Sequence, residues 1–248
     1  MRAKLKQLNV AKWVSLLLFI GLIYLLQLSY FNLKDWLTDE KSVPLSALIL
    51  TGDNTHVPFN QVRDVLIKQE DRLNFFTVEI AQIQKELEDM PWVYSVSIRK
   101  RWPETLKIHI VEQSIVAVWN DRALLNRFGE IVEAPPSSAK QEYVALYGID
   151  ELANDVLTTF MELHQLLKVS QFNIASLSSD QRQSTSLTLK NGIMLRLGKE
   201  QKLDRIQLFL TVYPLIKKKY DVKKIDYIDL RYDTGFSIGW KSDSELIK

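Results

Sequence analysis

The sequence predicts an α+β protein with one N-terminal membrane-spanning helix followed by two folded regions. Three observations lead to this class. Residues 13–33 carry no charge, residues 43–113 follow the order strand, helix, helix, strand, strand, and residues 114–241 combine short strands with two longer helices. The last region is expected to be a mostly antiparallel β domain with flanking helices, because its strands are short and separated by turn residues.

The uncharged stretch is long enough to cross a bilayer. Between Trp13 and Phe31 its only strongly polar side chains are Ser15, Gln27 and Ser29. At about 1.5 Å of rise per residue the stretch would span roughly 31 Å, close to the hydrocarbon thickness of a membrane. A soluble helix of this length would need a polar face, so we predict a transmembrane helix over residues 13–33.

Flanking charges predict the orientation of this helix. All charges in the first twelve residues are basic, and no acidic residue occurs before Asp35. Positive charge is retained in the cytoplasm, so residues 1–12 are expected to be a cytoplasmic tail, residues 34–42 a stalk, and the remainder to lie outside. A cleaved signal peptide is the alternative, but it requires small residues at its cleavage site, and residues 27–32 are mostly bulky.

Composition argues against several classes of function. The 32 basic and 30 acidic residues become 28 and 30 once the four basic residues before the apolar stretch are subtracted, so the exported part is nearly neutral. A nearly neutral chain gives no support for nucleic-acid binding. Cysteine is absent, which excludes disulfide bonds, a thiol nucleophile and cysteine-ligated metal.

The first folded region contains a predicted strand over residues 45–50, closed by turn residues. Pro58 favours the start of a helix, because its fixed φ suits the first turn. A second helix is predicted from Thr77, as its N-cap, to Met90. A hairpin with one buried face follows, and we expect these apolar side chains to face the helices: Tyr94, Val96, Ile98, Leu106, Ile108 and Ile110.

The region from residue 114 onward begins with a predicted meander. Strands are expected over residues 116–119, 123–125 and 130–132, with a turn at Asn120-Asp121 between the first two. A helix over residues 154–168 follows, where large apolar residues recur at helical spacing.

The C-terminal part is predicted to contain two hairpins and a long helix. Asn191-Gly192 between apolar strands is a strong signal for a type I′ hairpin turn. The helix over residues 200–219 contains Pro214, which is expected to bend or interrupt it. Strands over residues 225–230 and 236–240 form the last pair.

Residue patterns for catalysis or metal binding are weak. His56, His109 and His164 share no metal-ligand spacing, and each is expected to be a surface or ordinary core residue. No phosphate-binding glycine loop, nucleophile elbow or zinc-protease motif occurs. Asp226 and Asp229 lie on opposite faces of a predicted strand, a poor geometry for acid–base cooperation. We therefore expect no catalytic residues, no metal and no cofactor, and a binding role instead.

Three segments carry a family resemblance when they are taken together. Residues 87–103 have the sequence LEDMPWVYSVSIRKRWP, residues 106–112 have LKIHIVE, and residues 227–240 have YIDLRYDTGFSIGW. With the basic tail and the single span, these segments resemble the FtsQ/DivIB family of bacterial cell-division proteins. The similarity extends from Lys12 to Trp240.

The resemblance implies a POTRA domain over residues 43–113, a β domain over residues 114–241 and a C-terminal tail over residues 242–248. It implies a divisome scaffold without catalytic activity, anchored in the inner membrane with its C-terminal part in the periplasm at the division septum. The implied partners are FtsB and FtsL, and other divisome proteins through the POTRA domain and the membrane span.

The resemblance also implies a binding site, because the last strands of the β domain form the FtsB contact in the family. A family arginine matches Arg182 only loosely. The residues from Phe236 onward would offer an open strand edge, and Gly235 is expected to allow the tight turn before it. The matching residues of the implied contact in the last strand pair are Arg231, Tyr232, Thr234, Gly235, Phe236 and Trp240.

Several alternatives remain open from the sequence alone. Tyr232 and Trp240 are ordinary core aromatics if the resemblance is set aside. The lysines at 217–219 and 223–224 fit a solvated helix end better than a binding patch. The rival functions are a membrane-tethered cell-wall enzyme and a chaperone-like POTRA protein that handles exported polypeptides.

Overall fold

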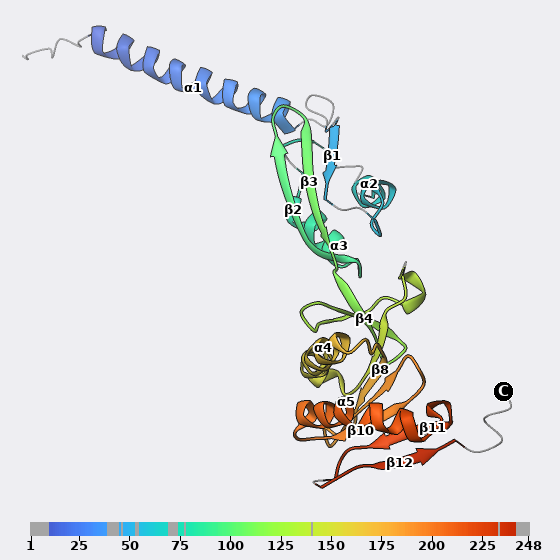
Figure 1. Ribbon diagram of the computed structural model, residues 1–248. Coiled ribbons are helices and arrows are strands. Elements are labelled where there is room, and N and C mark those ends of the chain that lie inside the picture. The colour runs from blue at the N-terminus through green and yellow to red at the C-terminus, as the bar shows by residue number, and fades with distance from the viewer. Residues whose placement is uncertain are drawn as a thin grey trace, which may run out of the picture. The chain divides into compact units, whose positions relative to one another are not determined.

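The computed structural model describes residues 10–38, 45, 47–52, 55–68, 74–76, 78–139, 141–232 and 234–241 (Figure 1). The chain divides into two compact units, Met1–Glu112 and Gln113–Lys248. Each unit has its own hydrophobic core.

The N-terminal helix α1 (Val10–Thr38) contains the predicted membrane span. Its segment Trp13–Trp36 has a mean hydropathy of 2.1 and is not buried by other parts of the described protein. An apolar helix without protein cover suits a lipid environment, because water would meet all of its large side chains. The structure thus confirms one helix with the length and composition of a membrane span.

The first folded unit has the predicted order of elements. It consists of β1 (Ala47–Thr51), α2 (Phe59–Ile67), α3 (Ile80–Glu88), β2 (Val93–Arg101) and β3 (Thr105–Glu112) (Figure 1). The sheet order is β1-β3-β2, with β1 parallel and β2 antiparallel to β3. Side chains from both helices and from the central strand share one core, which includes Val62, Ile83, Leu87, Leu106, Ile108 and Ile110.

The register of β2 corrects one expectation from the sequence. Tyr94, expected on the buried face, is 44% exposed, whereas Val93 and Val96 are buried. The pairing with β3 shifts between Val93 and Ser95. Such an irregularity breaks the alternation of faces, so Tyr94 is turned away from the core.

The residues before α2 and α3 can be compared with the helix starts expected from the sequence. Pro58 occupies the cap position of α2, where it was expected. Thr77, the expected N-cap of the second helix, lies outside the described residues. Glu79 occupies the cap position before Ile80, the first residue of α3.

A polar and aromatic cluster forms where β3 ends. One carboxylate oxygen of Glu112 accepts hydrogen bonds from the backbone nitrogens of His56 (2.7 Å) and Val57 (2.8 Å). The other oxygen lies 3.1 Å from His56 Nδ1. The His56 ring stacks on Trp92 with 3.7 Å between ring centroids. These contacts tie the end of β3 to the segment before α2 and give His56 a structural role.

The second unit is built on a nine-stranded sheet with the order β12-β11-β10-β9-β8-β7-β4-β5-β6. Five of the strand pairs are antiparallel and three are parallel, which confirms a mostly antiparallel domain. Its strands are β4 (Ile115–Trp119), β5 (Ala123–Asn126), β6 (Ile131–Val132), β7 (Val144–Tyr147), β8 (Ile174–Ser179), β9 (Thr185–Leu189), β10 (Met194–Gly198), β11 (Ile225–Asp229) and β12 (Ser237–Trp240).

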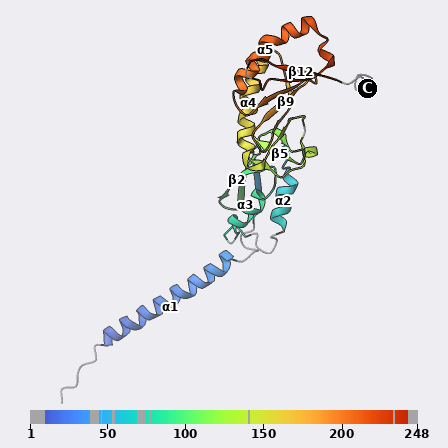
Figure 2. The same ribbon diagram turned by 90° about the horizontal axis from the view of Figure 1, so that it is seen from below.

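Two helices, α4 (Ala153–Val169) and α5 (Lys202–Lys219), accompany this sheet (Figure 2). Their apolar side chains share one core with the strands, including Leu163, Leu167, Ile206, Phe209, Leu187 and Leu195. Short 3-10 helices cover Pro136–Ser138, Asp150–Leu152 and Val222–Lys224. Pro214 lies inside α5 without interrupting it.

The turns of the sheet correct a second expectation. Gly192 has φ 88°, but Asn191 keeps a negative φ, so the turn there is not type I′. Gly192 N donates to Leu189 O, and Leu189 N donates to Ile193 O, as in a three-residue loop closed by a left-handed glycine. The type I′ geometry, with two consecutive positive φ angles, occurs instead at Asn120-Asp121 between β4 and β5.

Candidate functional site

The strongest candidate site is the edge strand β12 with the residues that precede it. β12 is the last strand of the sheet, so one of its sides pairs with β11 and the other has no neighbouring strand among the described residues. Every second N–H and C=O group of such a strand points away from the sheet. The edge can therefore accept a further strand.

An apolar groove runs between β12 and the C-terminal half of α5. Its volume is about 500 Å³. Trp240 is 48% exposed, and its ring meets Tyr220 edge-on with 5.2 Å between centroids. The groove lies on the helix-bearing face of the sheet, and its lining comes from Val212, Leu215, Ile216, Lys219, Tyr220, Phe236, Ile238 and Trp240.

A buried carboxylate orients the arginine at the end of β11. Asp229 is 3% exposed and accepts hydrogen bonds from Arg231 Nε (2.9 Å) and Nη2 (2.7 Å) and from the Arg231 backbone nitrogen (3.1 Å). These hydrogen bonds, with a smaller contribution from the charge of Arg196, hold the pKa of the Asp229 carboxyl below its usual range. The Arg231 side chain is still 52% exposed, so its charge is fixed in place and available at the surface.

A glycine allows β12 to lie close to its neighbour. Tyr227 of β11 pairs with Gly239 of β12, and a Cβ on Gly239 would lie 2.1 Å from Tyr227 Cε1. The guanidinium carbon of Arg196, on β10, lies 3.8 Å from the centre of the same ring. The tyrosine ring therefore covers the glycine and supports the edge strand. Gly239 was not predicted as a functional residue from the sequence, although a glycine inside a strand is a signal of close approach.

The residues expected at the partner contact, except Arg182, lie in or around this strand pair. Tyr232 is 58% exposed, and Trp240 is about half exposed, so neither is an ordinary core aromatic. Thr234 is exposed, and Phe236 lines the groove. Gly235, expected to allow the turn, has no positive φ, and an added Cβ would meet no atom within 4 Å, so this geometry gives no reason for glycine at that position.

Arg182 lies apart from the strand pair. It is in the loop between β8 and β9, where its backbone nitrogen donates to Asp180 Oδ1 at 2.8 Å. Strands β10 and β11 separate this hairpin from β12. The pairings of β9 with β10 and of β10 with β11 bring the loop to the end of the sheet where Arg231 follows β11.

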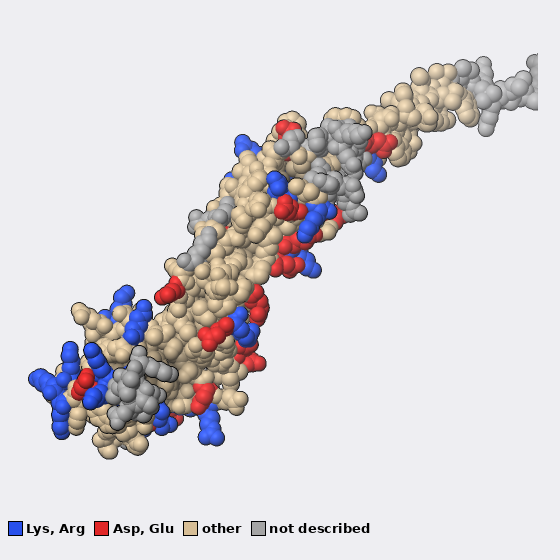
Figure 3. Space-filling view, turned by 90° about the vertical axis from the view of Figure 1, so that its right-hand side faces the viewer, with Lys and Arg blue, Asp and Glu red and all other residues tan. Residues whose placement is uncertain are grey.

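Basic residues gather beside the groove. Figure 3 shows lysine and arginine concentrated at one end of the second unit. The last turn of α5 contributes Lys217, Lys218 and Lys219, and the following 3-10 helix contributes Lys223 and Lys224. Lys219 also lines the groove, which favours a partner with acidic groups near its apolar contacts.

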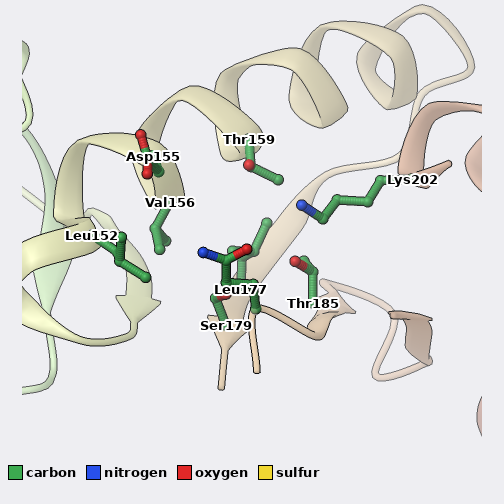
Figure 4. A pocket seen from close by; sticks show the side chains of 9 residues that line it. Leu152, Asp155, Val156, Thr159, Leu177, Ser179, Thr185 and Lys202 are labelled. Carbon is green, nitrogen blue, oxygen red and sulfur yellow. The ribbon is translucent and has the colours of Figure 1, made fainter. Parts of the chain in front are cut away.

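A smaller hollow of about 210 Å³ lies between α4, the start of α5 and the ends of β8 and β9. Figure 4 shows the ammonium group of Lys202 pointing toward the space between Thr159 and Thr185, with Asp155 on the rim. No group of histidine, aspartate and glutamate residues suited to a metal ion occurs in the described parts of the chain.

Comparison with known proteins gives consistent matches to both units. The family described as POTRA domain, FtsQ-type matches residues 43–113, and the family described as cell division protein FtsQ/DivIB, C-terminal matches residues 117–231. The chain is 38% identical to cell division protein FtsQ of Shewanella oneidensis, covering 96% of this chain and 90% of that protein. It is 33% identical to FtsQ of Escherichia coli, covering 94% and 86%.

Proposed function

Because the chain belongs to the FtsQ/DivIB family of cell-division proteins, we propose that it is a non-enzymatic divisome scaffold whose β12 edge binds FtsB. The role in cell division follows from family membership. The observation that carries the finer proposal is the open edge of β12 beside an apolar groove, with Trp240 exposed in the groove's lining and Tyr232 exposed between β11 and β12.

An extended FtsB segment would add a tenth strand to the sheet. Its backbone would pair with Ser237–Trp240, and this pairing would supply affinity with little dependence on sequence. Side chains of a strand alternate between faces, so only every second FtsB residue would enter the groove beside α5. The partner segment should therefore alternate apolar and polar residues.

Aromatic and charged side chains would select this partner. Tyr232 and Trp240 offer large rigid surfaces of the kind enriched at interface hot spots. Arg231 already donates to Asp229 through Nε and Nη2, which leaves Nη1 to bind a carboxylate of the partner. Thr234 and Gly235 would border the contact, and Arg182 would be an outlying contact at the same end of the sheet.

The remaining parts of the proposal concern topology and further partners. The N-terminal tail would be cytoplasmic and both folded units periplasmic, at the division septum. FtsL would join through the same complex as FtsB. Other divisome proteins would contact the POTRA unit and α1, and the protein would bind no nucleic acid.

Site-specific crosslinking in cells tests the FtsB contact. A photo-crosslinking residue at Ser237, exposed on β12, should trap FtsB. The same residue at Glu133, exposed just after the opposite edge strand β6, is the matched control and should not. If FtsB is crosslinked equally at the two positions, or not at all at Ser237, β12 is not part of the FtsB site.

A separate assay tests the absence of enzymatic activity. Peptidoglycan incubated with the purified full chain in detergent should release no fragments above a protein-free blank. Reproducible cleavage would support the rival function of a membrane-tethered cell-wall enzyme.

A further inference from the structure

The turn between β2 and β3 presents a tryptophan that the proposed function does not use. Trp102 is 77% exposed, the highest value for any aromatic side chain among the described residues. A single exposed apolar residue needs no explanation by itself. Its meaning depends on the charges around it and on where the turn lies relative to the membrane helix.

Basic residues surround Trp102 on the face of the sheet that the helices leave open. Arg99 lies directly opposite Lys107, and Arg101 is opposite Thr105. All three basic side chains are exposed, and none forms an ion pair within the described residues. Like charges that face each other across strands repel, so this arrangement is favoured by an external anion. Glu104 in the turn offsets one of these charges.

Lys100 does not belong to this surface. Its Nζ donates to Phe76 O at 3.2 Å and lies 5.7 Å from the centre of the Phe75 ring. Burial lowers the pKa of Lys100, as expected for an ammonium group turned toward the protein. Alternation along β2 thus sends Arg99 and Arg101 outward and keeps Lys100 inward.

Chain connectivity limits how far this turn can lie from the end of the membrane helix. Nine peptide steps join Thr38, the last residue of α1, to Ala47, the first residue of β1. These two residues are therefore at most about 32 Å apart by any path. Ala47 pairs with Thr105, which pairs with Arg101, so β1 begins beside the turn. The chain leaves the sheet at Glu112, at the opposite end of β3.

We infer that the β2–β3 turn rests on the bilayer that α1 crosses, with Trp102 among the lipid headgroups and Arg99, Arg101 and Lys107 facing anionic phospholipid. Tryptophan is enriched at the membrane–water interface, because its ring is apolar and its N–H is polar. Basic side chains close to a bilayer are attracted to anionic headgroups over a Debye length. The contact would restrict how the POTRA unit tilts relative to the membrane.

The test uses the full chain reconstituted in vesicles that contain phosphatidylglycerol and lipids brominated on the acyl chain near the headgroup, which quench tryptophan fluorescence at the interface. The chain has six tryptophans. The difference between the parent and Trp102→Phe therefore isolates the signal of Trp102. The matched control is Trp240→Phe, which isolates an exposed tryptophan of the second unit.

We expect the Trp102 signal to be quenched several-fold more than the Trp240 signal. Quenching should be lost in the Arg99→Glu, Arg101→Glu double variant and in vesicles of phosphatidylcholine alone. High salt provides the same test without a substitution, because it screens headgroup attraction.

Equal quenching of the two tryptophans would overturn the inference. The turn would then be better explained as a contact for a protein partner. If Trp102 is quenched equally in the Arg99→Glu, Arg101→Glu variant, in phosphatidylcholine vesicles and at high salt, anionic phospholipid has no role in the contact. The inference rests on α1 crossing the membrane and not on FtsB binding, so it can fail while the proposed function stands.

Discussion

The nine-stranded sheet ends in two edges that differ in length and in their surroundings. β12 has four residues and borders an apolar groove, whereas β6 has only the two residues Ile131–Val132. Directly after β6, Ala134 N donates to Val132 O at 2.7 Å, and a proline pair follows. Short edge strands and prolines protect an edge from pairing with another chain. The sheet is thus closed to partners at β6 and open at β12.

Exposed aromatic residues occur near both edges, and the comparison shows why exposure alone is a weak criterion. Phe128, in the turn before β6, is 44% exposed, and the Arg127 guanidinium carbon lies 4.8 Å from its ring centre. Trp240 belongs to an open edge strand and lines a groove at once, and Tyr232 is exposed in the segment between β11 and β12. A site is indicated when backbone pairing, apolar surface and a fixed charge coincide.

Gly239→Val is expected to reduce the difference between the β12 and β6 edges the most. A side chain there would collide with the Tyr227 ring, displace β12 and make the two edges alike. FtsB binding should be lost, and the free energy of unfolding should fall by about 1–3 kcal/mol, the usual cost of overpacking. Titration of purified FtsB and chemical denaturation measure the two effects. The control Gly235→Ala has room for its methyl group and should keep the parent's free energy of unfolding.

A smaller loss of FtsB binding is expected from Tyr232→Ala. Truncation of an exposed hot-spot aromatic should weaken FtsB binding by about 2 kcal/mol and leave the melting temperature close to the parent's. Phe128→Ala, which removes an exposed aromatic at the other edge, should change neither quantity. If both variants bind FtsB equally well, Tyr232 is not part of the contact.

A lower stability and a still smaller loss of FtsB binding are expected from Asp229→Asn, because the substitution removes the charge that holds the Arg231 side chain in place. The pKa of Asp229 is lower in the folded protein than in the unfolded chain, so its ionised form contributes stability above about pH 3.9. That contribution disappears as the pH falls through the lowered pKa. In Asp229→Asn, the free energy of unfolding should lack this pH-dependent contribution. At pH 7 it should be lower than the parent's by about 1.5–3 kcal/mol, the usual effect of losing a hydrogen bond to a charged group.

FtsB binding at neutral pH should weaken by a smaller amount in the same variant, because Arg231 remains present but mobile. An acid-unfolding profile that is identical in the parent and in Asp229→Asn would show that the buried pair does not form in solution.

The smallest effect is expected from the lysines at the end of α5. The Lys217→Ala, Lys218→Ala double variant should weaken FtsB binding by less than about 1 kcal/mol, mostly through slower association, because rim charges act over long range and are screened by salt. Stopped-flow association at two salt concentrations measures this. Lys168→Ala, in the last turn of α4, is the control and should keep the parent's salt dependence.

Local patterns accounted for much of this fold. The uncharged stretch indicated α1, alternation with short turns indicated the β2–β3 hairpin, and the order of five elements in the first unit followed from periodicity. The strands β7 and β8 were missed. β7 has four residues and pairs in parallel with β4 and β8, which are distant in sequence. β8 contains three serines, and only Ile174 and Leu177 of its six residues are buried, so its hydrophobic pattern is weak. The burial of Tyr94 was wrongly expected because one irregular pair in β2 reverses the alternation.

Hydrophobic periodicity and segment length are local properties, so they were enough to predict a helix with the length and composition of a membrane span, a compact first unit and a final strand pair. The position of β12 at the edge of a nine-stranded sheet, and the groove that α5 forms beside it, became evident from the three-dimensional fold alone. The fold also showed that Gly239, rather than Gly235, is the constrained glycine. These features depend on which distant strands pair and which side chains then meet, and no local pattern specifies that pairing.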